Sequence, residues 1–377
     1  MRKRLIAFTA LLATVASGAV WGGVRSFRHA EASPTAAISQ DERAQGAVEY
    51  KSRLLELLLS AEGGQAVSVA SNSRKEEEIR LIPGGTVFGA RISYDRVRVK
   101  STERESPIRE GDEIVAINGE EVFSIEDIKS ATEKCKTDSA TVTVIRGGTE
   151  LKLTVGLKDG RLGLELSEGT AGIGTLTYID PTDGSFGGLG HGICDTHSGE
   201  VLPIKSGEIT GVILGGVQKG ECGKPGELCG ILTDRPFGSV YRNTGCGLFG
   251  KMSSRSSYRD SAEKAIPIMK KEELKSGEAT VISTVKNSMT REYSIEITSI
   301  NTEENGSKCF KFKVTDPTLI ALTGGVVRGM SGSPIIQDGK LVGAVTHVMV
   351  ADPTEGYGIF IENMLNAAQN QVQPKAA

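Results

Sequence analysis

A serine set between two glycines is the part of this sequence best suited to covalent chemistry. Residues 329–334 read GMSGSP, with Ser331 near the centre. A serine nucleophile needs an exposed hydroxyl on a tight turn, where its own N–H and the N–H two residues earlier point at one place. Glycine at 329 leaves that earlier N–H unobstructed, so we predict Ser331 as a nucleophile and Gly329 and Ser331 as oxyanion-hole donors. Small residues also suit the end of an ordinary hairpin, so the motif indicates a nucleophile only if the chain also supplies a general base.

The base that would activate this serine must come from the four histidines of the chain. His191 lies in the glycine-rich segment GGLGHGICD, where a loop can present an imidazole, and we predict it as the base. His29 lies in a polar N-terminal stretch and His197 in a polar turn. His347 follows the serine on an apolar strand, where it is either a pocket residue or a buried structural histidine.

A carboxylate that fixes the histidine tautomer would complete the set. The candidates that lie between the histidine and the serine include Asp195, Asp234, Asp260 and Asp316. Asp316 follows the predicted strand FKFKV and begins the loop that leads to the serine, which is a reasonable place for such a group. Asp195 is so near His191 in the chain that only a sharp bend would let it orient the ring, and we interpret it as a loop cap or a surface charge.

Metal binding and disulfide formation are the other chemistries that the residue types suggest. The segment HGICDTH has the ligands of a zinc site, but no second Cys or His pair follows at the spacing that zinc sites use. We therefore predict no metal and no cofactor. Among the six cysteines, Cys222 and Cys229 flank a GKPGE turn at a spacing that suits a disulfide, and the sequence leaves the pairing open.

The composition describes a folded chain with room for two domains. It has 377 residues, of which 38% are hydrophobic and 24% charged. A net charge of −3 argues against nucleic acid as the main partner, because phosphate binding needs a basic excess. The 47 glycines indicate many turns and short strands.

The first 24 residues differ from the rest. A basic head, MRKR, precedes an uncharged run from Leu5 to Val24. This layout is typical of a secretory signal peptide and equally of a helix kept as a membrane anchor, and both interpretations stay open. We expect an exported protein in which residues 25–78 form a linker with a short amphipathic helix at 49–60.

Residues 79–158 have the pattern of a compact mixed unit. Period-two strands surround a helix that Ser124 caps. This segment resembles a PDZ domain, most specifically in GDEIVAINGEEV at residues 111–122. The loop before its first strand is then the place where a peptide carboxylate would meet backbone N–H groups, since glycines let the backbone approach. This loop comprises Gly84, Gly85, Thr86, Val87, Phe88 and Gly89. The alternative is that the two glycines only make a turn.

Residues 160–365 are rich in short β-type segments separated by turns, which favours an all-β sandwich or barrel. Residues 366–377 are predicted as a frayed tail. The exported head, the PDZ-like unit and three motifs, GLGHGICD, TDPTLIALTGG and GMSGSPIIQDGKLVGAVTHV, together resemble the sporulation stage IV B serine peptidase family of endospore-forming bacteria. The resemblance implies a mainly β chain with a PDZ domain followed by a chymotrypsin-like double β-barrel. It also implies His191, Asp316 and Ser331 as a catalytic triad.

The same resemblance implies a signalling peptidase. Such a protein would be exported across the forespore membrane into the intermembrane space, anchored before cleavage, and would cleave itself. Its further partner would be a membrane-associated regulator whose cleavage activates an intramembrane protease. The PDZ unit would bind a peptide, the chain's own cleaved segment being one candidate.

Two alternatives carry different expectations. In the first, the β domain is catalytically inactive and the protein is a PDZ adaptor that only binds peptides. In the second, the serine works with a lysine, and Lys340 in the turn QDGK is the nearest lysine after Ser331.

Overall fold

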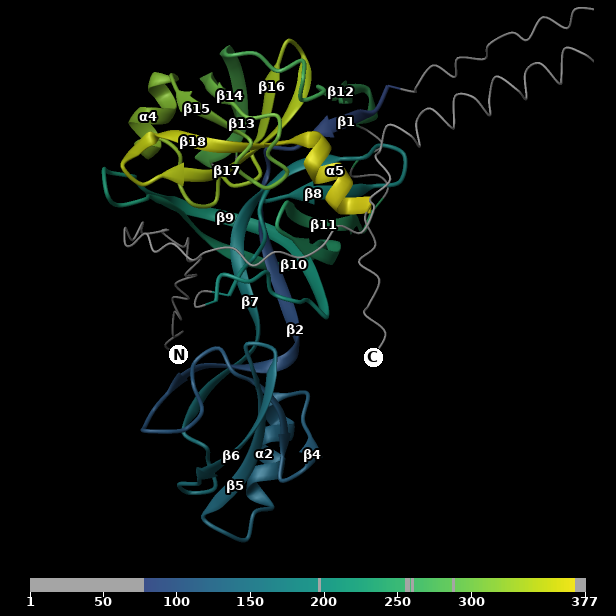
Figure 1. The fold of residues 1–377 in the computed structure, drawn as a ribbon. Coiled ribbons are helices and arrows are strands. Elements are labelled where there is room, and N and C mark those ends of the chain that lie inside the picture. The colour runs from purple at the N-terminus through teal and green to yellow at the C-terminus, as the bar shows by residue number, and fades with distance from the viewer. Residues whose placement is uncertain (1–77, 196–197, 255–257, 259–260, 287–288, 370–377) are drawn as a thin grey trace, which may run out of the picture. The chain divides into compact units, whose positions relative to one another are not determined.

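The fold is built almost entirely from antiparallel strands, which form two closed barrels and a small domain (Figure 1). The structure is a computed structural model that describes residues 78–195, 198–254, 258, 261–286 and 289–369. The predicted N-terminal signal or anchor segment, the helix at 49–60 and the end of the predicted tail lie outside the described residues. Within the described part of the chain, no helix is both long and apolar enough to cross a membrane.

Six strands close the first barrel in the order β7-β8-β11-β10-β9-β2, and β2 pairs back to β7. Their bounds are β2 Val87–Thr102, β7 Leu164–Ile179, β8 Ser185–Gly188, β9 Ser206–Gln218, β10 Glu227–Thr244 and β11 Gly247–Met252. Two short strands, β1 (Arg80–Pro83) and β12 (Ile266–Pro267), extend the sheet beyond β7, and a 3₁₀ turn covers Ala262–Lys264.

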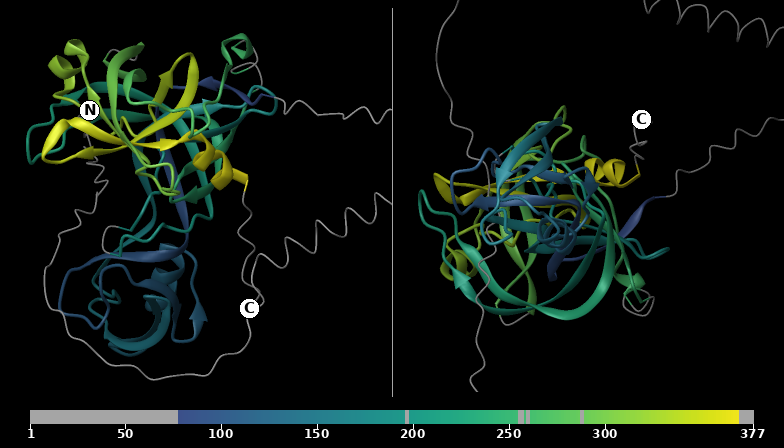
Figure 2. Two further views of the ribbon diagram at one scale, coloured as in Figure 1. Left: turned by 45° about the horizontal axis from the view of Figure 1, so that its top comes forward. Right: turned by 90° about the horizontal axis from the view of Figure 1, so that it is seen from below.

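The second barrel is also six-stranded and closes in the order β13-β14-β15-β18-β17-β16. Its strands are β13 Gly277–Lys286, β14 Met289–Ile300, β15 Phe310–Val314, β16 Pro334–Gln337, β17 Lys340–Met349 and β18 Asp352–Phe360. Helix α4 (Pro317–Thr323) follows β15, and helix α5 (Ile361–Gln369) follows β18. Figure 2 shows this barrel, coloured green to yellow, from two further directions. Two six-stranded barrels confirm the predicted mainly β, chymotrypsin-like architecture.

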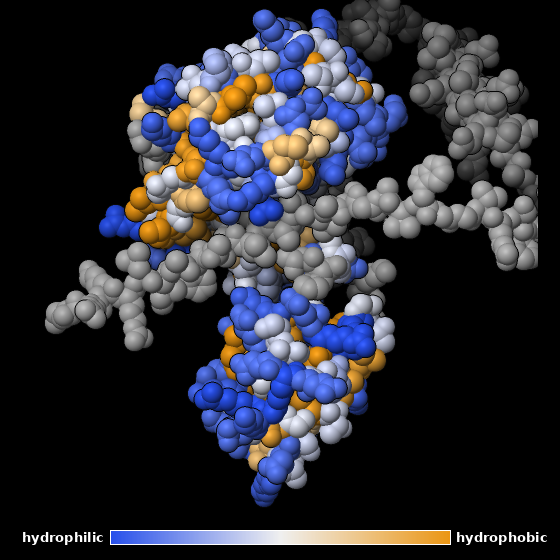
Figure 3. Space-filling model, turned by 90° about the vertical axis from the view of Figure 1, so that its left-hand side faces the viewer, coloured by the Kyte–Doolittle hydropathy of each residue, from blue (hydrophilic) through white to orange (hydrophobic). Residues whose placement is uncertain are grey.

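Period-two burial explains why these segments form strands. In β15, Phe310, Phe312 and Val314 are buried while the two intervening lysines are exposed, so one face of the strand packs in the core. One apolar cluster draws residues from both barrels, including Val87 and Phe249 of the first and Ile295 of the second. On the face drawn in Figure 3, the surface is largely hydrophilic with scattered apolar patches, as expected when alternate strand residues point outward.

The small domain, residues 96–168, has its own core. It contains β3 (Glu113–Ile117), β4 (Glu120–Glu121), β5 (Ser139–Arg146), β6 (Thr149–Gly156) and helix α2 (Ile125–Glu133), with the adjoining halves of β2 and β7. Ser124 caps α2 as predicted, because its hydroxyl accepts a hydrogen bond of 3.0 Å from the Asp127 N–H.

The chain enters and leaves the small domain through the first barrel, so the domain boundaries differ from the predicted ones. We predicted a unit at 79–158 followed by a peptidase domain at 160–365. Instead β1 and the first half of β2 belong to the barrel, where β1 pairs with β7 and β12, and the first half of β2 pairs with β7 and β9. The small domain is therefore inserted between two barrel strands. Because β2 and β7 each run for 16 residues without a break, the sequence carries no boundary signal there.

Candidate active site

The turn that carries Ser331 depends on its two glycines. Gly329 and Gly332 both have φ of +95°, a region that residues with a side chain rarely adopt. A Cβ atom at position 332 would lie 1.9 Å from the carbonyl oxygen of Thr175. The close approach of β7 to this turn, together with the positive φ, is therefore the reason that the motif needs glycine after its serine.

Two threonines of β7 hold the nucleophile turn from the other side. The Thr175 N–H donates to the Ser331 carbonyl (2.9 Å) and its hydroxyl donates to the Gly329 carbonyl (2.8 Å). The Thr177 hydroxyl donates to the Gly332 carbonyl at 2.8 Å, and both threonines are 0% exposed. Sequence reasoning missed them, because threonine alternating with apolar residues looks like any other half-buried strand.

The oxyanion-hole donors predicted from the sequence are the N–H groups that the turn leaves unused. The N–H groups of Met330, Gly332 and Ser333 all donate to backbone carbonyls. No described group accepts a hydrogen bond from the N–H of Gly329 or of Ser331. Two unused donors beside a serine hydroxyl can stabilise the negative oxygen of a tetrahedral intermediate.

The Ser331 hydroxyl donates to the carbonyl oxygen of Thr346 at 2.9 Å. Thr346 lies in β17 and is held in place by its own hydroxyl, which bonds the carbonyls of Ser307 (2.6 Å) and Tyr357 (3.1 Å). In this conformation the serine proton is directed at a backbone carbonyl, so rotation of the serine side chain must precede proton transfer to an imidazole.

His191 follows β8 on a tight turn in which Leu189 and Gly190 have φ of +65° and +66°. Its Nδ1 lies 2.9 Å from the carbonyl oxygen of Gly192. A carbonyl can only accept, so Nδ1 carries the hydrogen and Nε2 keeps its lone pair. Burial lowers the pKa of His191, and the Gly192 hydrogen bond partly opposes that shift. The ring is thus a neutral imidazole in the tautomer that a general base requires.

A second imidazole, that of His347, lies beside the first. The ring centroids of His191 and His347 are 5.0 Å apart. Burial is the main cause that lowers the pKa of His347, to about 3, and electrostatic interactions with His191 and Lys308 add to it. Its Nδ1 is buried without a hydrogen-bond partner among the described residues. His347 is therefore uncharged at neutral pH. It follows directly after Thr346, whose carbonyl accepts the hydrogen bond of the Ser331 hydroxyl.

The structure does not bring Asp316 to this cluster, contrary to its predicted role in a triad. Asp316 caps helix α4, where its carboxylate accepts from the N–H groups of Thr318 (2.8 Å) and Leu319 (2.9 Å). No carboxylate is among the groups that shift the pKa of His191 or of His347. A TDP segment after a strand is thus explained locally: Asp followed by Pro at the first helical position is a favourable helix start.

The other carboxylates weighed for this role are also accounted for. Asp195 is paired with Arg98 at 3.1 Å, and Asp234 is paired with Arg91 at 3.0 Å on the surface of the first barrel. Asp260 and His197 lie outside the described residues. Within the described ranges, no three His, Cys, Asp or Glu side chains gather as metal ligands, and the six cysteines are free thiols.

The segment Gly84–Gly89 does not form a peptide-carboxylate loop, so that prediction is wrong. The N–H groups of Gly84 and Gly85 already donate to β7 carbonyls, at 2.9 and 2.7 Å. Val87 is 4% exposed and Phe88 0%, and Gly89 pairs with β7 on one side and β9 on the other. Glycines and apolar residues serve a barrel corner as well as a ligand loop, and here they serve the barrel.

The surroundings of Lys340 argue against the lysine alternative. The Lys340 ammonium lies 2.7 Å from the Glu273 carboxylate, on the turn between β16 and β17. The hydrogen bond to Glu273 raises the pKa of Lys340, so this lysine stays protonated and cannot accept the serine proton.

Comparison with known proteins places the chain in a family. A search of the curated proteins finds no match. Several solved structures resemble it weakly, including three of one protease. The inactive form of Rv3671c protease has TM-score 0.31, 13% identity, and covers 52% of this chain and 82% of that one. A mutant of Rv3671c from M. tuberculosis H37Rv in its inactive form has TM-score 0.31, 14% identity, and 54% and 84% coverage. The active form from M. tuberculosis has TM-score 0.32, 11% identity, and 78% and 84% coverage.

The sequence profile of one peptidase family matches residues 158–365, which is more than half of the chain and includes His191 and Ser331. The match extends over the second barrel, most of the first barrel and the turn whose geometry suits acyl transfer. The chain belongs to the SpoIVB peptidase S55 family.

Proposed function

We propose that the protein is a serine endopeptidase in which Ser331 is the nucleophile and His191 the general base. The observation that supports this assignment is that the site has both free oxyanion donors and an imidazole held in one tautomer. The nucleophile turn leaves the N–H groups of Gly329 and Ser331 unused, and the Gly192 carbonyl holds His191 in the tautomer that exposes the Nε2 lone pair.

Catalysis would follow the usual two acyl-transfer steps. The Ser331 hydroxyl turns from Thr346 towards His191, whose Nε2 takes its proton as Oγ bonds to the peptide carbonyl carbon. The negative oxygen of the tetrahedral intermediate accepts from the two unused N–H groups. The imidazolium then gives the proton to the leaving amine, which leaves an acyl-enzyme. Water attacks the acyl-enzyme while His191 takes a proton from it, and that proton passes to the Ser331 oxygen as the acid leaves.

The group that orients the base differs from the predicted triad. A backbone carbonyl can fix the tautomer of a histidine as a carboxylate does, although it stabilises the imidazolium less, because it carries no full charge. We infer that Gly192 performs this role and that Asp316 serves the helix α4.

We expect Asp316→Asn to react with a fluorophosphonate probe at Ser331 within about tenfold of the wild-type rate, since asparagine caps a helix as well as aspartate does. Reaction rates and the labelled residue are measured by mass spectrometry of the full chain. If Asp316 instead held His191, the same change would slow turnover about 10⁴-fold, as it does where an aspartate orients the base.

The control for that experiment is Asp316→Ala, which removes the cap. It should lower the free energy of unfolding by about 1 kcal/mol while leaving the labelling rate of the folded protein unchanged. A 10⁴-fold loss in Asp316→Asn with unchanged thermal stability would restore the triad and refute the role of Gly192.

Family membership supports a role in sporulation, and the resemblance supports a more specific one. We infer that the protein is exported across the forespore membrane, cleaves itself, and cleaves a membrane-associated regulator of an intramembrane protease. Loss of N-terminal residues from the wild type but not from Ser331→Ala, followed by intact mass, would support self-cleavage.

The small domain offers a second function, the binding of an extended peptide, at a place other than the predicted one. Residues 164–167 of β7 pair with β2 on one edge and with no described strand on the other. Helix α2 packs near that open edge, where the Glu168 carboxylate accepts from the Ile125 N–H. A strand edge beside a helix suits addition of a peptide strand.

The peptide site is tested by hydrogen exchange on the Ser331→Ala protein. We expect a peptide with a free C-terminal carboxylate to slow exchange in residues 125–133 and 160–168, and an amidated peptide to bind more weakly. Slowed exchange in 84–89, or equal binding of the two peptides, would contradict this placement.

A further inference from the structure

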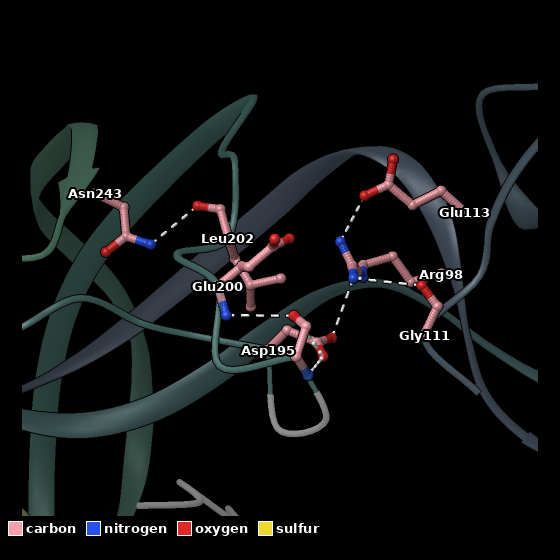
Figure 4. Close-up of polar contacts among 8 residues, drawn as sticks. Arg98, Gly111, Glu113, Asp195, Glu200, Leu202 and Asn243 are labelled. Carbon is pink, nitrogen blue, oxygen red and sulfur yellow. Dashed lines mark hydrogen bonds and ion pairs between the residues drawn. The ribbon is translucent and has the colours of Figure 1, made fainter. Parts of the chain in front are cut away.

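An arginine of the small domain is bonded to the loop that carries the catalytic histidine (Figure 4). Arg98, on β2, places its guanidinium between two carboxylates. One is Glu113 on the neighbouring strand β3, at 2.5 Å, and the other is Asp195, at 3.1 Å. The same guanidinium lies 3.4 Å from the Gly111 carbonyl.

These three side chains are largely withdrawn from water, so removing one partner leaves a buried charge uncompensated. The side chains of Arg98, Glu113 and Asp195 are 14%, 22% and 13% exposed. Solvent screens a pair at this depth less than a surface pair, and a carboxylate left there without its cation is strongly disfavoured. The position of Asp195 is therefore tied to the position of Arg98.

Asp195 in turn shapes the histidine loop, whose described residues are 189–195 and 198–202. One carboxylate oxygen accepts from Arg98, and the other accepts from the Ser198 N–H at 2.9 Å. The backbone of Asp195 closes the same turn, since its N–H donates to the Glu200 carbonyl at 2.8 Å and its carbonyl accepts from the Gly199 N–H at 3.0 Å.

A second anchor lies on the other side of this loop. The Asn243 side chain accepts from the Ile193 N–H (2.9 Å) and donates to the carbonyls of Ile193 (2.7 Å) and Leu202 (3.0 Å). Asn243 comes from the first barrel, whereas Arg98 comes from the small domain. His191, two residues before Ile193, thus belongs to a loop held at one point by the barrel and at another by the small domain.

The strand that carries Arg98 also borders the open peptide edge of the small domain. Arg98 pairs with Ser167 of β7. A peptide strand added at residues 164–167 would lie one strand away from Arg98 and would act on the strand that positions it.

We propose that Arg98 and Asp195 are positioning residues, and that their ion pair couples the small domain to the placement of His191. The inference rests on the proposed Ser–His function and adds to it a route by which the small domain controls the base. Neither residue touches the substrate; each acts through the loop.

The test compares kcat and KM for a small ester in Arg98→Met, Asp195→Asn and the double variant. Because a displacement of about 1 Å can lower turnover 10²-fold, we expect each single change to lower kcat on the order of 10²-fold with little effect on KM. Asparagine at 195 still accepts from the Ser198 N–H, so the turn persists and only the charge is lost. The double variant should be no worse than either single one, and Arg98→Lys should recover part of the activity.

Two other arginines serve as controls, one in exposed ion pairs and one bound to a buried carboxylate. Arg91 lies on the same strand and also pairs with two carboxylates, Glu208 at 3.2 Å and Asp234 at 3.0 Å, away from the histidine loop. Arg146 binds the buried Asp112 at 2.7 Å within the small domain. We expect Arg91→Met to keep wild-type kcat, and Arg146→Met to lower the thermal stability of the small domain with a much smaller loss of kcat.

Equal kcat in Arg98→Met and Arg91→Met would overturn the proposal. Equal losses of kcat in Arg98→Met and Arg146→Met would also overturn it, because the effect would then come from unfolding of the small domain. Additive losses in the double variant would show that the two residues do not act as a pair. The outcome is separable from the peptidase assignment, because wild type that fails to react with a fluorophosphonate at Ser331 refutes the Ser–His function itself.

Discussion

Replacing Ser331 with alanine is expected to lower kcat for a small ester about 10⁶-fold, and His191→Ala to lower it by a similar factor. In the proposed mechanism Ser331 supplies the attacking oxygen and His191 removes its proton, so neither step proceeds without the other. The double variant should therefore be no slower than either single variant. The remaining rate, measured with enzyme that keeps wild-type thermal stability, comes from the two unused N–H groups and from substrate binding.

His347→Gln is the matched control, because it removes the neighbouring imidazole of the same site. Burial lowers the pKa of both imidazoles, but only His191 has its Nδ1 held by a carbonyl, whereas the Nδ1 of His347 has no hydrogen-bond partner among the described residues. We therefore expect a far smaller loss than in His191→Ala. If His347→Gln proved as damaging as Ser331→Ala while His191→Ala remained active, the two histidines would have to exchange roles.

Gly332→Ala is expected to give the second largest effect, a loss of kcat on the order of 10²- to 10³-fold together with lower thermal stability. The new Cβ would lie 1.9 Å from the Thr175 carbonyl oxygen and 2.5 Å from the Leu189 nitrogen. The nucleophile turn would therefore have to move away from both β7 and the start of the histidine loop. The proposed nucleophile, oxyanion donors and base would then no longer lie in the same positions relative to one another.

Gly339→Ala separates this effect from backbone strain alone. Gly339 also has a left-handed φ, +72°, in the turn between β16 and β17, but nothing lies within 4 Å of the Cβ position. It should lower the free energy of unfolding by about 1 to 2 kcal/mol and leave kcat unchanged. Wild-type kcat in folded Gly332→Ala would show that the close approach of β7 is not needed for catalysis.

Much of the fold could be predicted from the sequence, because period-two burial is a local property. The alternation in FKFKV became β15, and the Ser124 cap starts α2 as predicted. The tight turn formed by Ser331 and the two glycines around it could be predicted for a similar reason. A turn at positive φ excludes most side chains, so it leaves a mark in the sequence wherever the turn folds.

The domain boundaries and the use of the Gly84–Gly89 segment could not be predicted from the sequence. Gly84–Gly89 has the residue types of a ligand loop, yet its N–H groups bond to β7, and that strand follows it only after the whole small domain. Asp316 likewise has the residue type and the place of a triad member, and its local use as a helix cap is the one realised.

What the sequence determined by itself was the strand pattern, the nucleophile turn and the histidine presented by glycines. The tertiary structure alone decided the threonine clamp from β7, the carbonyl that orients His191, and the pairing of Arg98 with Asp195. The physical reason is the range of the interactions. A dihedral angle or a cap restricts residues within a few positions, whereas a hydrogen bond between distant strands restricts only a donor and an acceptor, which almost any residue supplies.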